Sequence, residues 1–526
     1  VDCWCAYYDE LKEHVAQFTP DWAAEICQVP AEDIAAAARF YAGAERGAIQ
    51  WGLAFDTQVD SIQLCQTVSN LMSVCGNIDK PGTNILVRNG FEINPGYATA
   101  QLYCDPDTFA KKLTVDLVHP GCVQFIGMAD CDAVNRAFET GEPYPIKMFW
   151  SQGSNGIACS ATAAPRVHKM LQNVEFCVVA DPYMTPSAVA FADIFLPLKT
   201  TAERDSMRVW WTPLRAMKAV SEWYEAKSDE QIIVEMGNRL NPEAFEALGI
   251  KTDIDFLNWY LHDGTGSFSA TTEATDQGGA KNSGKTLFTA DWEELVKDPS
   301  MLGHCYDEFN ATYHKAAKGM FREDGSVGYG TPSGRLELAP MLYRYWGLST
   351  TPFHTEPPYG PLSTPELMEE YPLILTCGGR SFEFFHSEDR QEPTMREFHP
   401  EPRVKVSPGT AAEYGLQDGD WIWMENDEGR CKQMVEVFAG IPDDCLSAEH
   451  GWWKPEEEGA VPHLHGCFDY NVNNLTRNFQ SGPGGIGSPI KCTRCRIYKV
   501  KDGDVMPGEQ ITQLGGWRDD YQPMQA

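Results

Sequence analysis

The sequence suggests a first binding site in a loop rich in glycine and hydroxyl groups. A carboxylate follows this loop at the end of the next predicted strand. Ser151, Gly153 and Asn155 follow an apolar stretch, and Asp181 ends the next one along the chain, four residues before Thr185. Backbone N–H groups at a helix N-terminus bind phosphate, and a carboxylate can accept two hydrogen bonds from a ribose or a guanine edge. The loop lacks the G-x-G-x-x-G pattern, so an ordinary turn between strand and helix is the alternative.

A second group of chemically capable side chains follows a glycine pair in the C-terminal third. Gly379 precedes Arg380, and His386 and Ser387 come shortly after. A cation, an imidazole and a hydroxyl behind a glycine turn suit a phosphate or a pyran-type ligand. The alternative is a polar loop without a ligand. No spacing in the chain indicates a Ser-His-Asp or Cys-His arrangement.

The thiols and imidazoles do not form a recognisable metal site. The chain has 17 cysteines, an odd number, and most of them lie in apolar stretches, which is typical of reduced, buried thiols. Cys492 and Cys495 have redox or zinc spacing, but no second pair follows at the distance of a zinc finger. His463 and His465 lack a nearby third ligand. We interpret these pairs as structural, and the glycine-dense stretch 482–487 as a flexible loop.

The elements that must position the first group are strands alternating with helices. Apolar runs at 145–150, 176–180 and 193–197 predict strands, and residues 163–172 and 185–192 predict helices between them. Such alternation indicates right-handed crossovers and a parallel sheet. Ligands bind beyond the carboxyl ends of the strands in these sheets. Both the glycine loop and Asp181 fall at such ends.

Three further patterns surround this unit. Residues 9–44 predict helices, and residues 47–52 predict a strand. A further helix is predicted from Ser61, with Asp60 as its N-cap. That last helix has an apolar stripe expected to face the core: Ile62, Cys65, Val68, Leu71, Met72 and Cys75. From Tyr371 onward, short strands at 373–377, 404–406, 421–425 and 433–438 predict a small barrel.

These patterns divide the chain into three parts. Residues 1–205 form an α/β domain, residues 206–365 hold the remaining middle elements with an insertion and a linker, and residues 366–526 form a C-terminal six-stranded β-barrel domain. The fold class is therefore α/β with a Rossmann-like dinucleotide-binding parallel sheet, followed by a barrel.

Composition narrows the possible partners. The chain has 526 residues, and 42 basic against 75 acidic residues give a net charge of −33. A surface this acidic argues against nucleic acid and anionic membranes. No apolar run is long enough for a transmembrane helix. The first residues, from Val1, have no signal-peptide features. The chain begins either after processing or within a longer gene, and we favour a longer gene whose N-terminal portion is missing here.

In their order and spacing, several blocks resemble the molybdopterin oxidoreductases of the dimethyl-sulfoxide reductase family. The resemblance runs from about Phe18 to Val500. The blocks are Thr19–Ile26, Val29–Ile34, Trp51–Leu53, Thr57–Gln58, Gly76–Asn84, Ala192–Pro197 with Glu203, Thr331–Glu337, Asn471–Thr476 and Cys495–Tyr498.

This resemblance implies a bis(molybdopterin guanine dinucleotide) cofactor carrying molybdenum or tungsten. One dinucleotide would be held by the first set, Gly52, Leu53, Gln58, Ser151, Gly153, Asn155, Asp181 and Thr185. The other would meet the second set, Gly379, Arg380, His386 and Ser387, with Asn474 and Lys491 closing over the pterin. Arg88 occupies the place of an arginine beside the metal in formate-dehydrogenase-like relatives, and is the candidate catalytic residue. The residues after it, Asn89 and Gly90, depart from the usual Gly-Gln.

The resemblance also implies what lies outside the chain. The protein ligand of the metal and the cysteines of a 4Fe-4S cluster would precede Val1, so we expect this fragment to be inactive alone. The cofactor would supply two-electron oxygen-atom or hydroxyl transfer. Residues 450–453, with Asn471–Thr476 and Cys495–Lys499, resemble the branch containing pyrogallol hydroxytransferase, acetylene hydratase and anaerobic catechol dehydroxylases.

Within that branch we favour reductive dehydroxylation or hydroxyl transfer on a catechol-like aromatic substrate. The rivals are reduction of thiosulfate, polysulfide or an arsenic oxyanion, and a catalytically empty scaffold subunit. A nicotinamide-dependent enzyme would need the standard glycine fingerprint, which is absent from the sequence. A ferredoxin-like iron–sulfur electron-transfer subunit is the expected partner besides a small-molecule substrate. The compartment, cytoplasmic or reached by export in the folded state, stays open.

Overall fold

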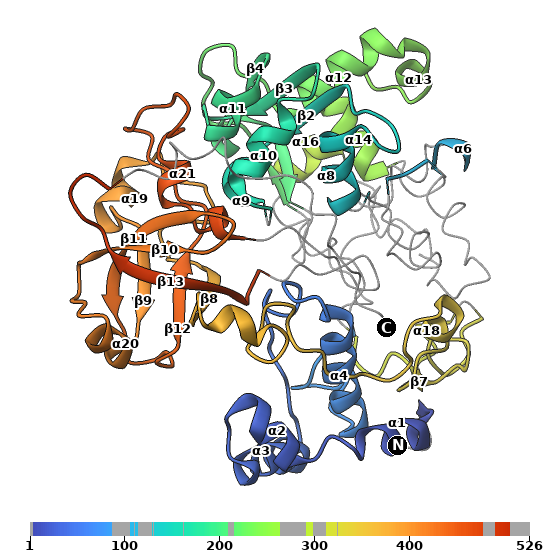
Figure 1. Ribbon diagram of the computed structural model, residues 1–526. Coiled ribbons are helices and arrows are strands. Elements are labelled where there is room, and N and C mark those ends of the chain that lie inside the picture. The colour runs from blue at the N-terminus through green and yellow to red at the C-terminus, as the bar shows by residue number, and fades with distance from the viewer. Residues whose placement is uncertain are drawn as a thin grey trace.

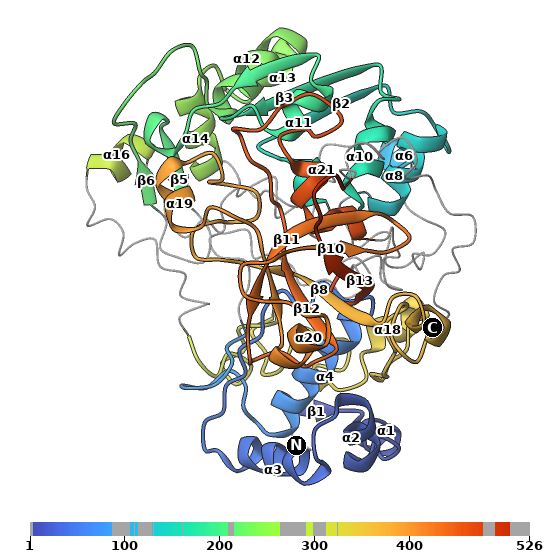
Figure 2. The same cartoon turned by 60° about the vertical axis from the view of Figure 1, so that its left-hand side comes forward.

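The computed structural model describes residues 4–86, 106–109, 111–113, 129, 131–160, 162–208, 215–262, 291–297, 312–322, 324–476 and 490–504. Within these ranges the parallel sheet lies at one end of the molecule and the N-terminal helices at the other (Figure 1). The barrel lies between these two ends, and the view from a second side agrees (Figure 2).

The N-terminal helices are α1 (Tyr8–Val15), α2 (Pro20–Cys27), α3 (Ala31–Gly43) and α4 (Ser61–Val74). Helix α2 begins as its sequence predicts, because the Thr19 side chain accepts a hydrogen bond from Trp22 N and Pro20 occupies the first turn. The prediction of helices over residues 9–44 is therefore confirmed.

The apolar stripe predicted for α4 is wrong, because the buried face of this helix is largely polar. Gln66 Nε2 donates to Thr350 O at 2.6 Å and Asn70 Nδ2 to Leu338 O at 3.0 Å, whereas Leu71 is exposed. The helix packs on irregular backbone at Leu338 and at residues 350–353, whose peptide groups need partners of their own. Amide side chains therefore face inward.

The strand predicted at residues 47–52 is also wrong. The peptide of Ile49 pairs with a side chain instead of a neighbouring strand. Its N–H donates to Asn84 Oδ1 at 2.8 Å, and its carbonyl accepts from Asn84 Nδ2 at 2.8 Å. One amide side chain thus supplies the hydrogen bonds that a strand would have made.

The predicted parallel strands form a three-stranded sheet in the order β2-β3-β4. Its strands are β2 (Met148–Gln152), β3 (Phe176–Asp181) and β4 (Ile194–Pro197), and both neighbouring pairs are parallel. The helices around it are α8 (Cys131–Thr140), α9 (Gly156–Cys159), α10 (Ala164–Leu171) and α11 (Pro186–Phe191). All three carboxyl ends lie at one edge.

The C-terminal strands close into a six-stranded barrel in the order β10-β11-β9-β12-β8-β13. They are β8 (Leu373–Gly379), β9 (Arg403–Val406), β10 (Trp421–Glu425), β11 (Arg430–Val437), β12 (Cys445–Glu449) and β13 (Thr493–Lys499). Alternate residues of β11, including Cys431 and Val435, point into the core, as the period of a strand requires. The barrel prediction is confirmed.

Short elements connect and border the barrel. They are η3 (Pro365–Met368), α19 (Pro393–Phe398), α20 (Pro408–Glu413), α21 (Cys467–Tyr470) and η4 (Val472–Leu475). Two of them, α21 and η4, pack against both β11 of the barrel and α10.

Between sheet and barrel the chain forms smaller elements. They are η1 (Thr201–Glu203), β5 (Ser206–Arg208), β6 (Arg215–Met217), α12 (Asp229–Leu240), α13 (Pro242–Ala247), α14 (Asp253–His262), α16 (Trp292–Lys297), β7 (Leu336–Glu337) and α18 (Met341–Trp346), with α6 (Pro106–Phe109) earlier in the chain. Strand β7 pairs in parallel with β1 (Cys5–Ala6), which ties the start of the described chain to residues more than 300 positions later.

One hydrophobic core joins the α/β region to the C-terminal region. Ile157 and Val167 of the sheet side pack with Trp453, Leu464 and Phe468 of the barrel side, and all five are buried. The two regions therefore share a core where they meet. None of the helices in the described part of the chain is long and apolar enough to cross a membrane.

Candidate functional site

A cavity of about 600 Å³ lies where the carboxyl edge of the sheet faces the C-terminal region. This volume is in the range of small-molecule sites. We call its two sides the sheet wall and the barrel wall. The sheet wall is Gly153–Asn155, Cys159, Asp181–Tyr183, Thr185, Leu198–Thr201, Arg204 and Asp229; the barrel wall is His386–Asp389, Gln391 and Trp453.

The backbone sets the geometry of the sheet wall. Gly153 has φ +55°, a conformation that glycine adopts without strain, and its N–H donates to Ala180 O at 2.8 Å. Asn155 is buried, and its Oδ1 accepts from Ser187 Oγ at 2.7 Å. Its Nδ2 donates to Ser387 Oγ at 3.2 Å, which links the two walls directly.

Asp181 ends β3 and Thr185 precedes α11, as predicted. The Asp181 carboxylate accepts from Tyr183 N at 2.9 Å, and burial raises the pKa of this carboxyl. Thr185 is the N-cap of α11, because its side chain accepts from Ala188 N at 3.3 Å. The wall thus presents a buried carboxylate beside a capped helix start.

The third strand end adds charges that sequence reasoning missed. Lys199 follows β4, and Arg204 forms an ion pair with Asp229 at 2.5 Å. Asp229 also accepts from Gln152 Nε2 at 2.6 Å. The strand-end rule applied to β4 would have found Lys199. Asp229, at the start of α12, had no comparable local signal.

His386 of the barrel wall is the middle member of a hydrogen-bonded series of three side chains, whose other two members do not line the cavity. Arg380 Nη2 lies 2.9 Å from His386 Nε2, and His386 Nδ1 lies 2.8 Å from His450 Nε2. Burial, with Arg380 second, lowers the pKa of His386. Burial likewise lowers the pKa of His450 to about 3, with His386 and nearby cations adding to it.

A buried arginine holds the backbone of this wall. Arg390 Nε donates to Gly451 O at 2.9 Å, and its Nη2 donates to His450 O at 3.0 Å and His386 O at 3.1 Å. Its guanidinium lies 4.0 Å from the Trp452 ring centroid and 4.3 Å from that of Phe384. Desolvation lowers its pKa to about 9.

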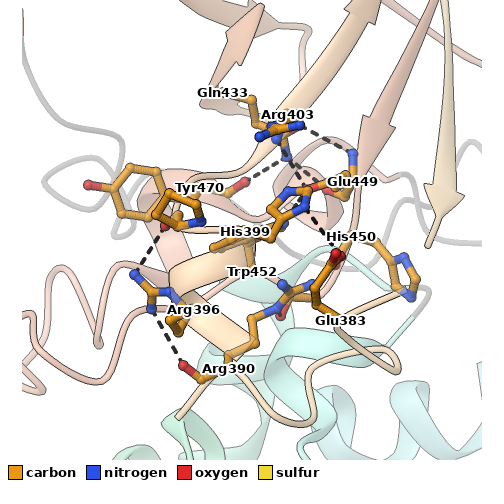
Figure 3. A network of polar contacts seen from close by, with 12 residues as sticks. Glu383, Arg390, Arg396, His399, Arg403, Gln433, Glu449, His450, Trp452 and Tyr470 are labelled. Carbon is orange, nitrogen blue, oxygen red and sulfur yellow. Dashed lines mark hydrogen bonds and ion pairs between the residues drawn. The ribbon is translucent and has the colours of Figure 1, made fainter. Parts of the chain in front are cut away.

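The neighbouring polar network is centred on Glu449 (Figure 3). Its Oε2 accepts from Trp452 Nε1 at 2.7 Å and lies 3.1 Å from His399 Nε2. In Figure 3 the ring of His450 lies apart from this cluster and points away from it. Glu449 therefore pairs with Trp452 and His399, and the His450 ring takes no part in this network.

The cavity brings together six of the predicted site residues: Gly153, Asn155, Asp181, Thr185, His386 and Ser387. They come from both predicted sets, so the two sets border one shared space. Arg380 reaches this space through His386, and Ser151 lies in β2, where its Oγ donates to Ser154 O at 3.2 Å.

The other predicted residues lie elsewhere. Gly52 and Leu53 are exposed, and neither they nor Gln58 or Gly379 line the cavity. Lys491 Nζ donates to Cys377 O at 2.6 Å, and Asn474 Nδ2 donates to Phe468 O at 2.6 Å. Arg88 falls outside the described residues.

The thiol and imidazole pairs have structural partners. Cys495 is buried in β13, where burial raises its pKa, and a thiol without thiolate character is unreactive. His463 lies 2.9 Å from Asp469 Oδ2, and His465 Nδ1 lies 2.8 Å from Glu457 O. Across the described ranges, no three His, Cys, Asp or Glu side chains are grouped to hold a metal ion.

Two family models match the chain and define its class. The molybdopterin oxidoreductase model matches residues 15–239, and the molydopterin dinucleotide binding domain model matches residues 373–491. The first match contains all of the sheet wall, and the second contains all of the barrel wall. The chain belongs to the molybdopterin oxidoreductases of the dimethyl-sulfoxide reductase family, a family of enzymes.

Three relatives span nearly all of the chain. Dopamine dehydroxylase of Eggerthella lenta is 28% identical over 94% of this chain and 53% of its own length. Acetylene hydratase of Syntrophotalea acetylenica is 28% identical over 88% and 61%. The molybdopterin-containing subunit PhsA of thiosulfate reductase from Salmonella typhimurium is 26% identical over 90% and 61%. The chain thus spans 53–61% of the length of these relatives.

A solved structure shares the fold. Acetylene hydratase from Pelobacter acetylenicus superposes with a TM-score of 0.76 at 24% identity, over 95% of this chain and 67% of that protein. At this level of identity the likeness concerns the mixed α/β fold and not the reaction.

The two domains imply a bis(molybdopterin guanine dinucleotide) cofactor with molybdenum or tungsten, and the cavity fits such a group. Among the described residues, three buried polar atoms on or beside the barrel wall lack a hydrogen-bond partner: Gln391 Oε1, which lines the cavity, and Arg390 Nη1 and His450 Nδ1, whose side chains hydrogen-bond to His386. Buried polar groups without partners are rare in folded proteins. A large polar ligand between the walls would supply the missing partners.

Proposed function

We propose that this chain is the cofactor-binding part of a molybdenum or tungsten enzyme that removes or transfers a hydroxyl group on a catechol-like aromatic substrate. The observation that carries the proposal is the 28% identity to dopamine dehydroxylase along 94% of the chain. In such a dehydroxylation the substrate C–O bond breaks, two electrons and two protons are consumed, and water leaves. The cofactor supplies this two-electron chemistry when bound.

The roles proposed for the walls follow from their chemistry. On the sheet wall, the buried Asp181 carboxylate accepts two N–H bonds from a guanine edge, while Gly153, Asn155 and Thr185 surround the nucleotide, with Ser151 behind them. His386 and Ser387 of the barrel wall contact the second dinucleotide together with the neighbouring Gly379 and Arg380, and Asn474 and Lys491 lie toward its pterin. Gly52, Leu53 and Gln58 remain proposed contacts of the first dinucleotide.

The chemistry at the metal is proposed to involve parts beyond these walls. Arg88 remains the candidate residue for holding substrate. A metal-ligating residue, a 4Fe-4S cluster and an iron–sulfur electron-transfer subunit are proposed for the complete assembly, since the chain spans only 53–61% of its relatives.

Anaerobic purification of the protein from its complete gene tests this function. Metal analysis and acid release of guanine nucleotide measure the cofactor, and reduced viologen supplies electrons for a catechol substrate. We expect a product lighter by one oxygen by mass spectrometry. Metal and nucleotide without this product from any catechol tested would contradict the proposed reaction, and absence of both would favour a scaffold subunit.

Thiosulfate reduction is the second candidate, because the thiosulfate reductase subunit is 26% identical over 90% of this chain. The same preparation distinguishes the two. Sulfide release from thiosulfate with no loss of hydroxyl from catechols would replace the first proposal by this one.

The role of Asp181 is tested by Asp181→Asn. Its new NH₂ group would face the guanine N–H donors in place of an acceptor, so we expect at least a tenfold loss of bound guanine nucleotide. Asp193→Asn is the matched control, because Asp193 caps the Cys177 N–H on the same sheet at 2.7 Å and does not line the cavity. Equal nucleotide content in the two variants would remove Asp181 from the site.

A further inference from the structure

The Arg380–His386–His450 chain has a fixed direction. A guanidinium only donates hydrogen bonds, so His386 Nε2, at 2.9 Å from Arg380 Nη2, must accept. A neutral imidazole whose Nε2 accepts carries its proton on Nδ1. His386 Nδ1 therefore donates to His450 Nε2 at 2.8 Å. By the same rule, the proton of a neutral His450 lies on its Nδ1.

This Nδ1–H is a buried donor without an acceptor. His450 is 9% exposed, and within the described part of the chain its Nδ1 has no hydrogen-bond partner. Leaving a buried donor unpaired is unfavourable, because the group loses its hydrogen bonds to water without gaining others. Every other polar ring atom of the two histidines is paired. The hydrogen-bond chain thus ends in one free donor.

The surroundings of this donor are cationic. Arg380, Arg390 and Lys491 are the cationic side chains whose charges act on His450 and help to lower its pKa. Such a group of cations is notable in a protein of net charge −33. Arg390 also leaves its Nη1 unpaired and buried. A free N–H among cations is complementary to an oxygen that carries negative charge.

We propose that His450 is the last donor of the Arg380–His386–His450 hydrogen-bonded series. Its Nδ1–H binds an anionic oxygen, either of a cofactor phosphate or of an anionic substrate. Arg380 and His386 act through it as positioning residues, because their hydrogen bonds keep the proton on Nδ1. The inference rests on the proposed function only in requiring an anionic ligand at the barrel wall, where His386 lines the cavity and hydrogen-bonds to His450.

Two substitutions separate the donor from the shape of the ring. His450→Asn places an amide N–H near the position of Nδ1, whereas His450→Phe keeps a ring without any donor. His168 provides the matched control, because it is similarly buried at 7% exposure and packs its ring 5.6 Å from that of Phe468. His168→Asn and His168→Phe report the effect of altering a buried histidine that does not belong to the Arg380–His386–His450 series. Thermal melting tests whether all four variants fold.

Guanine nucleotide and metal retained per protein, after gel filtration at rising salt, are the first readout. We expect a loss of tenfold or more in His450→Phe, a loss of less than threefold in His450→Asn, and no difference within the His168 pair. If the acceptor belongs to the substrate, nucleotide content stays unchanged in His450→Phe, while KM for an anionic substrate rises tenfold or more and KM for a neutral analogue does not.

Pyrophosphate binding to cofactor-free protein, measured by calorimetry, is independent of whether the proposed reaction is right. The phosphate arm predicts that wild type and His450→Asn bind pyrophosphate and that His450→Phe binds at least tenfold more weakly. Equal behaviour of His450→Asn and His450→Phe in nucleotide retention, KM and pyrophosphate binding would overturn the inference. A wild type that holds metal and nucleotide but acts on no catechol would overturn the proposed reaction instead.

Discussion

The two walls of the cavity are built by different means. On the sheet wall, strand ends and a helix cap place Gly153, Asp181 and Thr185 by local backbone geometry. On the barrel wall, Arg390 holds the carbonyls of His386 and of residues 450–451, about 60 positions away. The comparison teaches that one wall depends on short-range order and the other on a single buried side chain. Substitutions in the barrel wall should therefore have the larger and less local effects.

The largest effect is expected from Arg390→Leu. The change leaves three backbone carbonyls without their donor, so we expect a loss of about 3–5 kcal/mol in the free energy of unfolding, measured by urea denaturation. Arg396→Leu is the control, because Arg396 also lies near Trp452 but pairs with the exposed Glu456. Similar losses in both variants would mean that Arg390 has no special role in the wall.

The pH dependence of stability is expected to report His450. Its pKa is lowered to about 3 in the folded protein and is about 6.5 when unfolded. The stability due to neutral His450 is fully present above pH ~6.5 and is lost as the pH falls toward 3, at about 1.4 kcal/mol per unit. His450→Asn should flatten this slope in denaturation curves at pH 4–7. An unchanged slope would show that His450 does not stay neutral.

A smaller and more local effect is expected on the sheet wall. Thr185→Ala removes the cap of α11 and should cost about 1 kcal/mol without changing the slope with pH, whereas Thr185→Ser should restore most of it. The measurement is the shift in urea midpoint. A loss as large as that of Arg390→Leu would contradict the distinction between the walls.

The smallest effect is the coupling between the walls. Asn155 and Ser387 form the hydrogen bond that joins them at 3.2 Å. A double-mutant cycle with Asn155→Ala and Ser387→Ala should give a coupling of about 0.5–1.5 kcal/mol. If the two losses in the free energy of unfolding were additive, the contact between Asn155 and Ser387 would not stabilise the protein.

The parts that sequence patterns predicted are those that depend on neighbours along the chain. The apolar runs before Asp181 and before Pro197 gave the parallel strands, and the strand-end rule then placed Gly153 and Asp181 at one edge. The short strands after Tyr371 gave the barrel. Thr185 as a helix start followed from the same local pattern.

The parts that escaped prediction depend on contacts across the chain. Nothing near Arg390 in sequence indicates that its partners are the carbonyls at 450–451, and the pairing of His450 with His386 crosses 64 positions. The α4 stripe failed for the same reason, because its partner is the irregular backbone near Leu338. The spacing of apolar residues along a helix shows that it has two different faces. Which face is buried depends on the segment against which the helix packs.

The core shared by α10 and α21 has a consequence for how the chain is made. Asn471 Nδ2 donates to Ala158 O across 313 positions at 2.8 Å, in the interior of the protein. At a synthesis rate of about 5–20 residues per second, the segment around Val167 would wait roughly 15–60 s for Phe468 to be translated. During that interval its apolar face has no native cover, so the nascent chain should be a client for chaperones until the last third emerges.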